Sequence, residues 1–275
     1  MKRRRAARDA APAQRRARGR TPPAVDVQRA WSSNGSRVER IDRVLVDELA
    51  PSVLVRGPEA HHLRDVLRVR PGDAVEAFDG RGYQARGVVA EVGHDGVSLT
   101  LEAAQATTSE PPLRLTLAVA LLKGDKLTDV IRPATEIGVS EFRLFVSTNC
   151  EARELSAVRL ERLRRVAQEA ARQSGRAVVP TVMPPVPFGD LSLEGLVVVG
   201  DPASTTSLAG LTTAARWHGA DAVSVVTGPE GGLTGAEVET LVAAGAEAVT
   251  LGPRVLRADT APVALAAAVL LPGAG

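Results

Sequence analysis

The sequence predicts an α/β fold: a C-terminal domain built on a mostly parallel sheet, preceded by a small β-barrel-like domain. Three short apolar runs, at residues 196–199, 223–227 and 248–251, each end in a glycine that is followed by a proline one or two residues later. The carboxyl ends of buried parallel strands point into the crevice where ligands bind, and glycine lets the backbone approach a ligand closely. These three loops therefore predict one pocket lined largely by backbone.

Strands and helices alternate ahead of these loops. Residues 113–122 and 141–146 are predicted strands, and residues 127–138 and 156–174 are predicted helices. In the longer helix, apolar and small side chains recur on one face at helical spacing: Leu160, Leu163, Ala167, Ala170 and Ser174. This alternation predicts a mostly parallel sheet covered on both faces.

Residues 38–107 have the pattern of short strands separated by turns. The runs at residues 73–78 and 83–92 predict a hairpin, because the Asp79-Gly80 pair between them tolerates the backbone of a tight turn. Another strand is expected at residues 97–101, and one helical stretch at residues 59–68. We therefore expect a small barrel at residues 38–107, joined by a linker to an α/β domain at residues 113–272.

Charge is distributed unevenly along the 275 residues. The first 40 residues carry twelve Lys or Arg against three acidic residues, whereas the rest of the chain is net acidic. Residues 1–37 are rich in Arg, Ala, Pro and Ser and show no helical or strand period, which predicts a disordered basic extension. A dispensable extension, a nonspecific nucleic-acid tether and a targeting segment are the alternatives for it.

Several classes of protein are disfavoured. No apolar run is long enough to span a membrane, and the lone Cys150 cannot form an internal disulfide, which fits a reducing cytoplasm. The glycine motif at residues 228–232 lacks the lysine of a nucleotide-triphosphate loop, and no dinucleotide fingerprint opens a helix. Four scattered histidines and one cysteine offer no metal-ligand spacing, so no metal is expected.

Taken in order, the motifs resemble those of the bacterial small-subunit ribosomal RNA uridine-N3 methyltransferases of the SPOUT superfamily. The strongest are GPEGGL at residues 228–233 with Glu237, and LGPRVLR at residues 251–257 followed by Asp-Thr-Ala. Supporting matches are HLR at 62–64, FDG at 78–80, KGDK at 123–126, ATEIGV at 134–139 and QSGR at 173–176. The resemblance extends over residues 40–270.

The resemblance implies a PUA-like RNA-binding barrel and a C-terminal domain whose chain forms a trefoil knot. It also implies a homodimer that binds S-adenosyl-L-methionine in the knot and acts on 16S ribosomal RNA. The cofactor residues carried over are Gly200, Asp201, Pro202, Gly228, Pro229, Glu230, Gly231, Gly232, Leu251, Gly252, Arg254, Val255, Leu256 and Arg257. Backbone amides and carbonyls of these loops suit the adenine edge, which needs an uncharged polar site.

The chain departs from the family pattern at a few positions. Asp259 stands where members have Glu, Pro133 where they commonly have Lys, Thr148-Asn149 where they have Glu-Arg, and Arg172 where they have Glu. The cofactor motifs are therefore intact, whereas some neighbouring or RNA-facing positions are not. These departures leave an inactive RNA-binding or assembly factor as one alternative, and a related knotted methyltransferase with another RNA target as a second.

Methylation at N3 requires a uridine proton to leave, so the chemistry calls for a general base or a cation that stabilises charge on O2 and O4. Arg257 or Arg254 is a candidate cation, and Asp259 or Glu230 is a candidate base or orienting group. Structural ion pairs are the alternative for the arginines, and an ordinary turn for the glycines. An unrelated α/β enzyme is a further alternative, disfavoured by the missing phosphate-loop signatures.

RNA binding is not evident from composition, because the chain has only two Trp, one Tyr and four Phe for base stacking. Since the chain beyond the basic extension is net acidic, recognition is expected to depend on localised basic residues and on RNA shape. The candidates are His62, Arg64, Arg68, Arg70, Arg81, Arg86, Arg172 and Arg176. This mode of binding suits the assembled 30S subunit better than free RNA.

Overall fold

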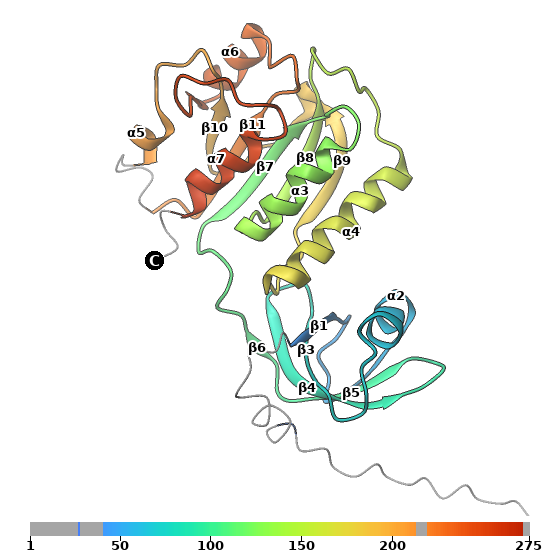
Figure 1. Ribbon diagram of the computed structural model, residues 1–275. Helices are drawn as coiled ribbons and strands as arrows, with labels where there is room; N and C mark the ends of the chain where they lie inside the picture. Colours follow the sequence, from blue (N-terminus) through green and yellow to red (C-terminus); the bar gives the residue numbers. More distant parts are fainter. Residues whose placement is uncertain (1–26, 28–40, 213–218, 272–275) are drawn as a thin grey trace, which may run out of the picture.

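The computed structural model describes Val27, residues 41–212 and residues 219–271, in which two sheets follow one another along the chain (Figure 1). The first contains β1 (Asp42–Leu45), β2 (Ser52–Val55), β3 (Ala74–Phe78), β4 (Tyr83–Val92), β5 (Val97–Leu101) and β6 (Gln105–Ala106). The second contains β7 (Arg114–Ala120), β8 (Glu141–Val146), β9 (Thr181–Pro187), β10 (Leu196–Gly200), β11 (Ala222–Thr227) and β12 (Glu247–Val249). The basic extension predicted at residues 1–37 lies outside the described residues, apart from Val27.

The first sheet has the order β1-β3-β4-β5-β2, with β6 paired to β4. All its pairs are antiparallel except β1 with β3. The predicted hairpin is confirmed: β3 and β4 pair across a turn in which Gly80 has φ 74° and Gly82 has φ 114°. Glycine is favoured at both positions because a Cβ disfavours this left-handed region. The Asp79 carboxylate accepts hydrogen bonds from the Arg81 and Tyr83 amides and fixes the turn.

One helical segment covers the first sheet. It begins as α2 (Gly57–His61) and continues as a turn of π-helix (His62–Leu67), so the predicted helix at residues 59–68 is confirmed with an earlier start. Ala60 and Leu63 are buried and pack into the apolar core of the sheet. Arg68, with φ 59°, ends the segment in a left-handed conformation.

The second sheet is parallel throughout, with the order β12-β10-β11-β7-β8-β9. Successive residues of β7 and β11 are buried, so these central strands are covered on both faces, as predicted. Three helices, α3 (Lys126–Ile137), α4 (Ala157–Ser174) and α7 (Ala261–Leu270), lie side by side against the sheet (Figure 1). Shorter elements are α5 (Leu208–Thr212), α6 (Gly235–Ala243) and a 3₁₀ turn (Phe188–Asp190). Helix α3 runs through Pro133 without interruption.

The segment between α4 and β9, residues 175–179, joins the two sheets. The Gly82 amide donates to the Ala177 carbonyl at 3.1 Å, and the Val179 amide donates to the Gly80 carbonyl at 3.0 Å. Arg43 of β1 donates from Nη1 to the Arg176 carbonyl at 2.8 Å. The first sheet is therefore attached to the second by hydrogen bonds that involve this backbone segment.

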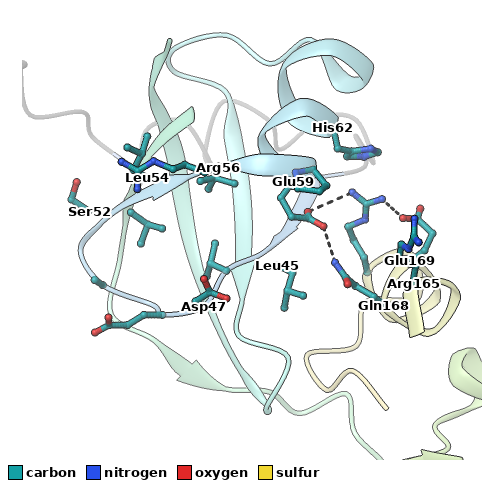
Figure 2. A pocket seen from close by; sticks show the side chains of 17 residues that line it. Leu45, Asp47, Ser52, Leu54, Arg56, Glu59, His62, Arg165, Gln168 and Glu169 are labelled. Carbon is teal, nitrogen blue, oxygen red and sulfur yellow. Dashed lines mark hydrogen bonds and ion pairs between the residues drawn. The ribbon is translucent and has the colours of Figure 1, made fainter. Parts of the chain in front are cut away.

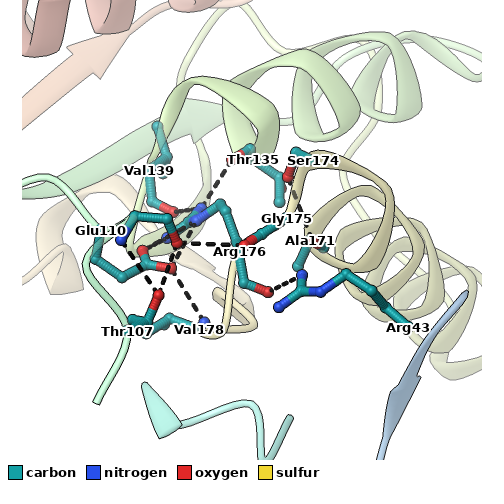
Figure 3. Close-up of polar contacts among 11 residues, drawn as sticks. Arg43, Thr107, Glu110, Thr135, Val139, Ala171, Ser174, Gly175, Arg176 and Val178 are labelled. Atoms are coloured by element: carbon teal, nitrogen blue, oxygen red, sulfur yellow. Dashed lines mark hydrogen bonds and ion pairs between the residues drawn. The ribbon is translucent and has the colours of Figure 1, made fainter. Parts of the chain in front are cut away.

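The side chain of Arg176 reinforces this junction (Figure 3). The residue is 3 % exposed, and Nη1 donates to the carbonyls of Thr135 and Val139 at 2.8 and 2.7 Å. Its Nη2 donates to Glu110 Oε2 at 2.7 Å, and Glu110 Oε1 accepts from the Val178 amide at 3.1 Å. The prediction that Arg176 contacts RNA phosphate is therefore corrected, because its guanidinium is buried and committed to these acceptors.

Candidate functional site

A cavity of about 340 Å³ lies at the carboxyl ends of β10, β11 and β12. The three glycine loops converge on it, as the sequence predicted. The predicted cofactor residues that line it are Gly200, Asp201, Pro202, Gly228, Pro229, Glu230, Gly231, Gly232, Leu251, Arg254, Val255 and Leu256. Gly252 and Arg257 belong to the same loop but do not line the cavity.

Other lining residues were not among the predicted cofactor residues: some lie next to the glycine loops, and others come from helices α6 and α7. They are Thr227, Leu233, Val238, Val249, Thr250, Ala258, Ala261 and Leu265. Leu265 of α7 lies directly beneath the end of β10, since a Cβ built on Gly200 would be 2.8 Å from Leu265 Cδ1. The C-terminal helix therefore forms part of the cavity wall, which gives the glycine at position 200 a packing role.

The wall of the cavity combines apolar side chains with available backbone groups. Within the part of the chain that the structure describes, the N–H and C=O groups of Leu251, Val255 and Leu256 make no hydrogen bond. Val249 and Leu265 supply buried apolar surface. Such a wall suits a neutral heteroaromatic ring with donors and acceptors at its edge, and the volume falls within the range of about 300–1,000 Å³ typical of small-molecule sites.

Glu230 anchors the glycine loop after β11. Its Oε1 accepts hydrogen bonds from Lys126 Nζ at 2.7 Å and from the Lys123 amide at 3.1 Å. Partial burial alone would raise the pKa of Glu230, but hydrogen bonds from Lys126 and from backbone amides outweigh it and hold the pKa below its ordinary value. Glu230 is therefore a stabilised carboxylate, which makes it a weak proton acceptor.

Arg257 and Asp259 form an ion pair beside the cavity. Arg257 Nε lies 3.5 Å from Asp259 Oδ1; the arginine side chain is 77 % exposed and the aspartate side chain 17 %. Neither lines the cavity, but Leu256 and Ala258, which alternate with them along the chain, do. Arg254 lines the cavity and makes no ion pair with any described residue. An accessible cation and a carboxylate thus lie at the edge of the cavity.

A larger cavity of about 810 Å³ lies between the first sheet and α4 (Figure 2). In it, Gln168 Nε2 donates to Glu59 Oε1 at 2.8 Å, and Arg172 Nη1 lies 4.0 Å from Glu59 Oε2. Arg172 also pairs with Glu169, and its side chain is 12 % exposed. This cavity has charged walls of both signs and none of the glycine loops, so we assign the smaller cavity as the candidate cofactor site.

The remaining predicted RNA-binding residues lie in the first sheet and its helical segment. Arg68, Arg70, Arg81 and Arg86 are exposed. Arg64 is half-buried and paired with Asp65 at 2.9 Å, and His62 lines the larger cavity. Arg64, Arg172 and Arg176 are therefore committed to carboxylates, and Arg68, Arg70, Arg81 and Arg86 are the solvent-exposed arginines of this set.

None of the helices in residues 41–212 and 219–271 has the length and apolar character needed to cross a bilayer. In the same ranges, His, Cys, Asp and Glu side chains form no group of three or more that could hold a metal ion.

Comparison with known proteins assigns both halves of the chain. Residues 109–270 match the family model of an RNA methyltransferase domain, and residues 55–102 match that of an RNA methyltransferase PUA domain. The α/β fold with a PUA-like N-terminal domain is thereby confirmed, while the knot and the domain boundaries stay predictions.

Individual relatives agree with this assignment. The chain is 33 % identical to the ribosomal RNA small subunit methyltransferase E of Synechocystis sp. over 90 % of its own length and 82 % of that protein. It is 32 % identical to the Bacillus subtilis protein of that name over 78 % of its own length and 88 % of that protein.

A solved structure shares this fold. The Neisseria gonorrhoeae ribosomal RNA small subunit methyltransferase E, bound to S-adenosyl methionine, superposes with a TM-score of 0.76 at 29 % identity, covering 85 % of this chain and 98 % of that one. The chain therefore belongs to the RNA methyltransferase family that includes the ribosomal RNA small subunit methyltransferases E.

Proposed function

We propose that the protein methylates N3 of a uridine in 16S ribosomal RNA, using S-adenosyl-L-methionine and acting on the assembled 30S subunit in the cytoplasm. The observation that carries the proposal is the backbone-lined cavity at the ends of three parallel strands. A relative of this chain was solved with S-adenosyl methionine bound, which supports the choice of cofactor.

The residues of the cavity fit this cofactor. Leu251, Val255 and Leu256 offer backbone donors and acceptors for an adenine edge, and Val249 and Leu265 offer apolar surface. When bound, S-adenosyl-L-methionine supplies an electrophilic methyl group on a sulfonium. The chain's main contribution is then to hold the acceptor uridine in line with that methyl group, because such positioning removes much of the activation barrier.

Proton removal is assigned to the ion pair beside the cavity. We place Asp259 as the acceptor of the uridine N3 proton and Arg257 as the cation that stabilises the charge left on O2 and O4. Glu230 holds the glycine loop instead, because its carboxylate is already bonded to Lys126 and Lys123. Arg254, which lines the cavity without an ion pair among the described residues, is the second cation near the reacting base.

Replacing Asp259 with alanine should lower turnover by about 100-fold or more, the range of general-base contributions. Binding of S-adenosyl-L-methionine should persist, since Asp259 does not line the cavity. Glu239→Ala, which removes an exposed carboxylate on α6, is the matched control and should leave turnover unchanged. Full turnover by the Asp259→Ala variant would remove this residue from the mechanism.

The proposal as a whole is tested by mass spectrometry of nucleosides. Purified protein and labelled S-adenosyl-L-methionine are incubated with undermodified 30S subunits or with protein-free 16S RNA. We expect labelled N3-methyluridine mainly from the subunits. Binding of the cofactor without label in either substrate would indicate another RNA target or a protein that only binds.

We also propose a homodimer that brings one subunit's PUA-like domain near the other's cavity. Helix α7 is apolar along its whole length. Val255 in the loop before it and Leu271 at its C-terminal end are 79 % and 59 % exposed, which favours burial against a second copy. Arg68, Arg70, Arg81 and Arg86 are then the proposed RNA contacts. The proposed boundaries, residues 38–107 and 113–272, separate the two sheets.

A further inference from the structure

The loop that follows β8 contacts the glycine loop of the cavity through one amide side chain. Asn149 Nδ2 donates to the carbonyl of Gly231 at 3.2 Å and to that of Gly232 at 3.1 Å. Two consecutive peptide groups of the cavity wall are therefore fixed by one side chain. Asn149 itself does not line the cavity.

The contact is also tight in a steric sense. A Cβ built on Gly231 would lie 3.1 Å from Asn149 Cβ and 3.5 Å from its carbonyl oxygen. The first of these contacts is tighter than an ordinary Cβ contact, so an alanine at position 231 would require the two loops to move slightly apart. The glycine at position 231 thus allows Asn149 to reach both carbonyls, and its φ lies outside the left-handed region, so space rather than conformation is its constraint.

Glu237 of α6 fixes the backbone next to Asn149. Its Oε1 accepts from the Thr148 amide at 2.8 Å and from Thr148 Oγ1 at 3.0 Å. Its Oε2 accepts from the Thr234 amide at 2.8 Å and from Thr234 Oγ1 at 3.0 Å, and so completes a capping box at the start of α6. One buried carboxylate thus joins the loop after β8 to the end of the cofactor loop.

The four hydrogen bonds that Glu237 accepts favour the ionised form of its carboxyl group. Burial alone would raise the pKa of Glu237, but hydrogen bonds from Thr148 and Thr234 outweigh burial and lower it. The loop is held from its other side by Arg153, which donates to the carbonyls of Ser147 and Thr148 at 3.1 and 2.7 Å. The backbone next to Asn149 is therefore held by hydrogen bonds from both Glu237 and Arg153.

We propose that Asn149 and Glu237 are positioning residues for the cofactor: Glu237 fixes Thr148, Asn149 fixes Gly231 and Gly232, and the loop at residues 228–232 keeps the shape that receives S-adenosyl-L-methionine. This inference rests on the proposed function. Both residues act through the loop, because neither lines the cavity. We call the hydrogen bonds from Asn149 to Gly231 and Gly232, together with those between Glu237 and Thr148, the clamp. Loss of the clamp lets the loop at residues 228–232 sample other conformations, which weakens cofactor binding without changing the reacting atoms.

The first test is calorimetric titration of S-adenosyl-L-methionine into the full chain carrying Asn149→Ala. Loss of two hydrogen bonds to the loop should raise the dissociation constant about tenfold. At saturating cofactor the turnover should stay within about twofold of wild type, since the chemistry of proton removal is unchanged. Glu239→Ala, which removes an exposed carboxylate on α6 outside this network, should bind the cofactor as the wild type does.

A double-mutant cycle separates this role from general destabilisation. Gly231→Ala alone should weaken cofactor binding because its Cβ meets Asn149. In wild type, the shift caused by the new Cβ should also break the two hydrogen bonds from Asn149. These bonds are already absent in Asn149→Ala, so Gly231→Ala should lower cofactor affinity by a smaller factor in that background than in wild type. Strictly additive effects, or an unchanged dissociation constant in Asn149→Ala, would overturn the inference.

Amide hydrogen exchange of the ligand-free chain tests whether Asn149 holds the loop, independently of whether the loop binds the cofactor. Residues 228–232 should exchange faster in Asn149→Ala than in wild type. If the wild-type chain binds no S-adenosyl-L-methionine, the proposed function and the cofactor role of the clamp are both rejected. If wild type binds but exchange and affinity are the same in the variant, only the clamp is rejected.

Discussion

Replacing Arg176 with alanine is expected to lower the free energy of unfolding by about 3–5 kcal/mol, the cost of breaking a buried ion pair. The residue is 3 % exposed, and its guanidinium is bonded to Glu110 and to the carbonyls of Thr135 and Val139. Its removal leaves the Glu110 carboxylate without its cation and two carbonyls without this donor. Since Glu110 precedes β7 and also accepts from the Val178 amide, the junction between the sheets loses its central contact.

Urea denaturation measures this loss as a change in the midpoint at constant slope. Arg165→Ala is the matched control, because Arg165 is exposed on α4 and makes no ion pair with a described residue; its change should stay within about 0.5 kcal/mol. Arg176→Lys keeps the charge but lacks the planar fork, so it should restore only part of the lost stability. A loss below about 1 kcal/mol in Arg176→Ala would show that the cluster is not a stabilising junction.

Arg176 also shows where sequence reading fails. The residues next to Arg176 in the sequence predict an exposed cation, because its partner Glu110 lies 66 residues away. Lys126 and Glu230, which meet at 2.7 Å, are 104 residues apart. Arginine is almost never fully buried unless it is paired, so a sequence without known contacts predicts exposure. Such pairs become visible only when the fold brings their segments together.

Local signals, in contrast, were sufficient for most of the fold. The Asp79-Gly80 turn predicted the β3–β4 hairpin, and the apolar runs ending in glycine predicted β10, β11 and the shared pocket. These features depend on backbone conformations and periodicities that a few adjacent residues determine.

Two elements had no such local signal. Strand β9 contains Pro184, Pro185 and Pro187, which lack a backbone N–H. The sheet tolerates these prolines because β9 is its edge strand. Helix α7 is apolar on all sides and has no amphipathic period, which is typical of a helix buried on several faces. Leu265, contributed by this helix, is accordingly the cavity residue that sequence reading was least able to predict.

The second large effect is expected at Gly228, where alanine should weaken binding of S-adenosyl-L-methionine by about 10- to 100-fold. A Cβ at this position would lie 2.7 Å from the Leu233 amide nitrogen and 3.0 Å from the Gly232 carbonyl carbon. Both are backbone atoms, so the loop itself has to move, and overpacking of this kind costs about 1–3 kcal/mol. The loop at residues 228–232 lines the cavity, so this displacement changes the shape of the proposed cofactor site.

Gly235→Ala is the matched control for this loop, because Gly235 begins α6 a few residues later and a Cβ there meets nothing within 4 Å. Its φ is not in the left-handed region, so alanine should be neutral or stabilise the chain by up to about 1 kcal/mol. Isothermal titration with both variants distinguishes a steric effect on the cofactor loop from a general effect of losing a glycine. Equal affinities in Gly228→Ala and Gly235→Ala would contradict the assignment of this loop to the cofactor. Weakened binding in Gly228→Ala alone, with a native circular dichroism spectrum and a cooperative unfolding transition, would support it, because the fold is then kept while the loop that lines the cavity is displaced.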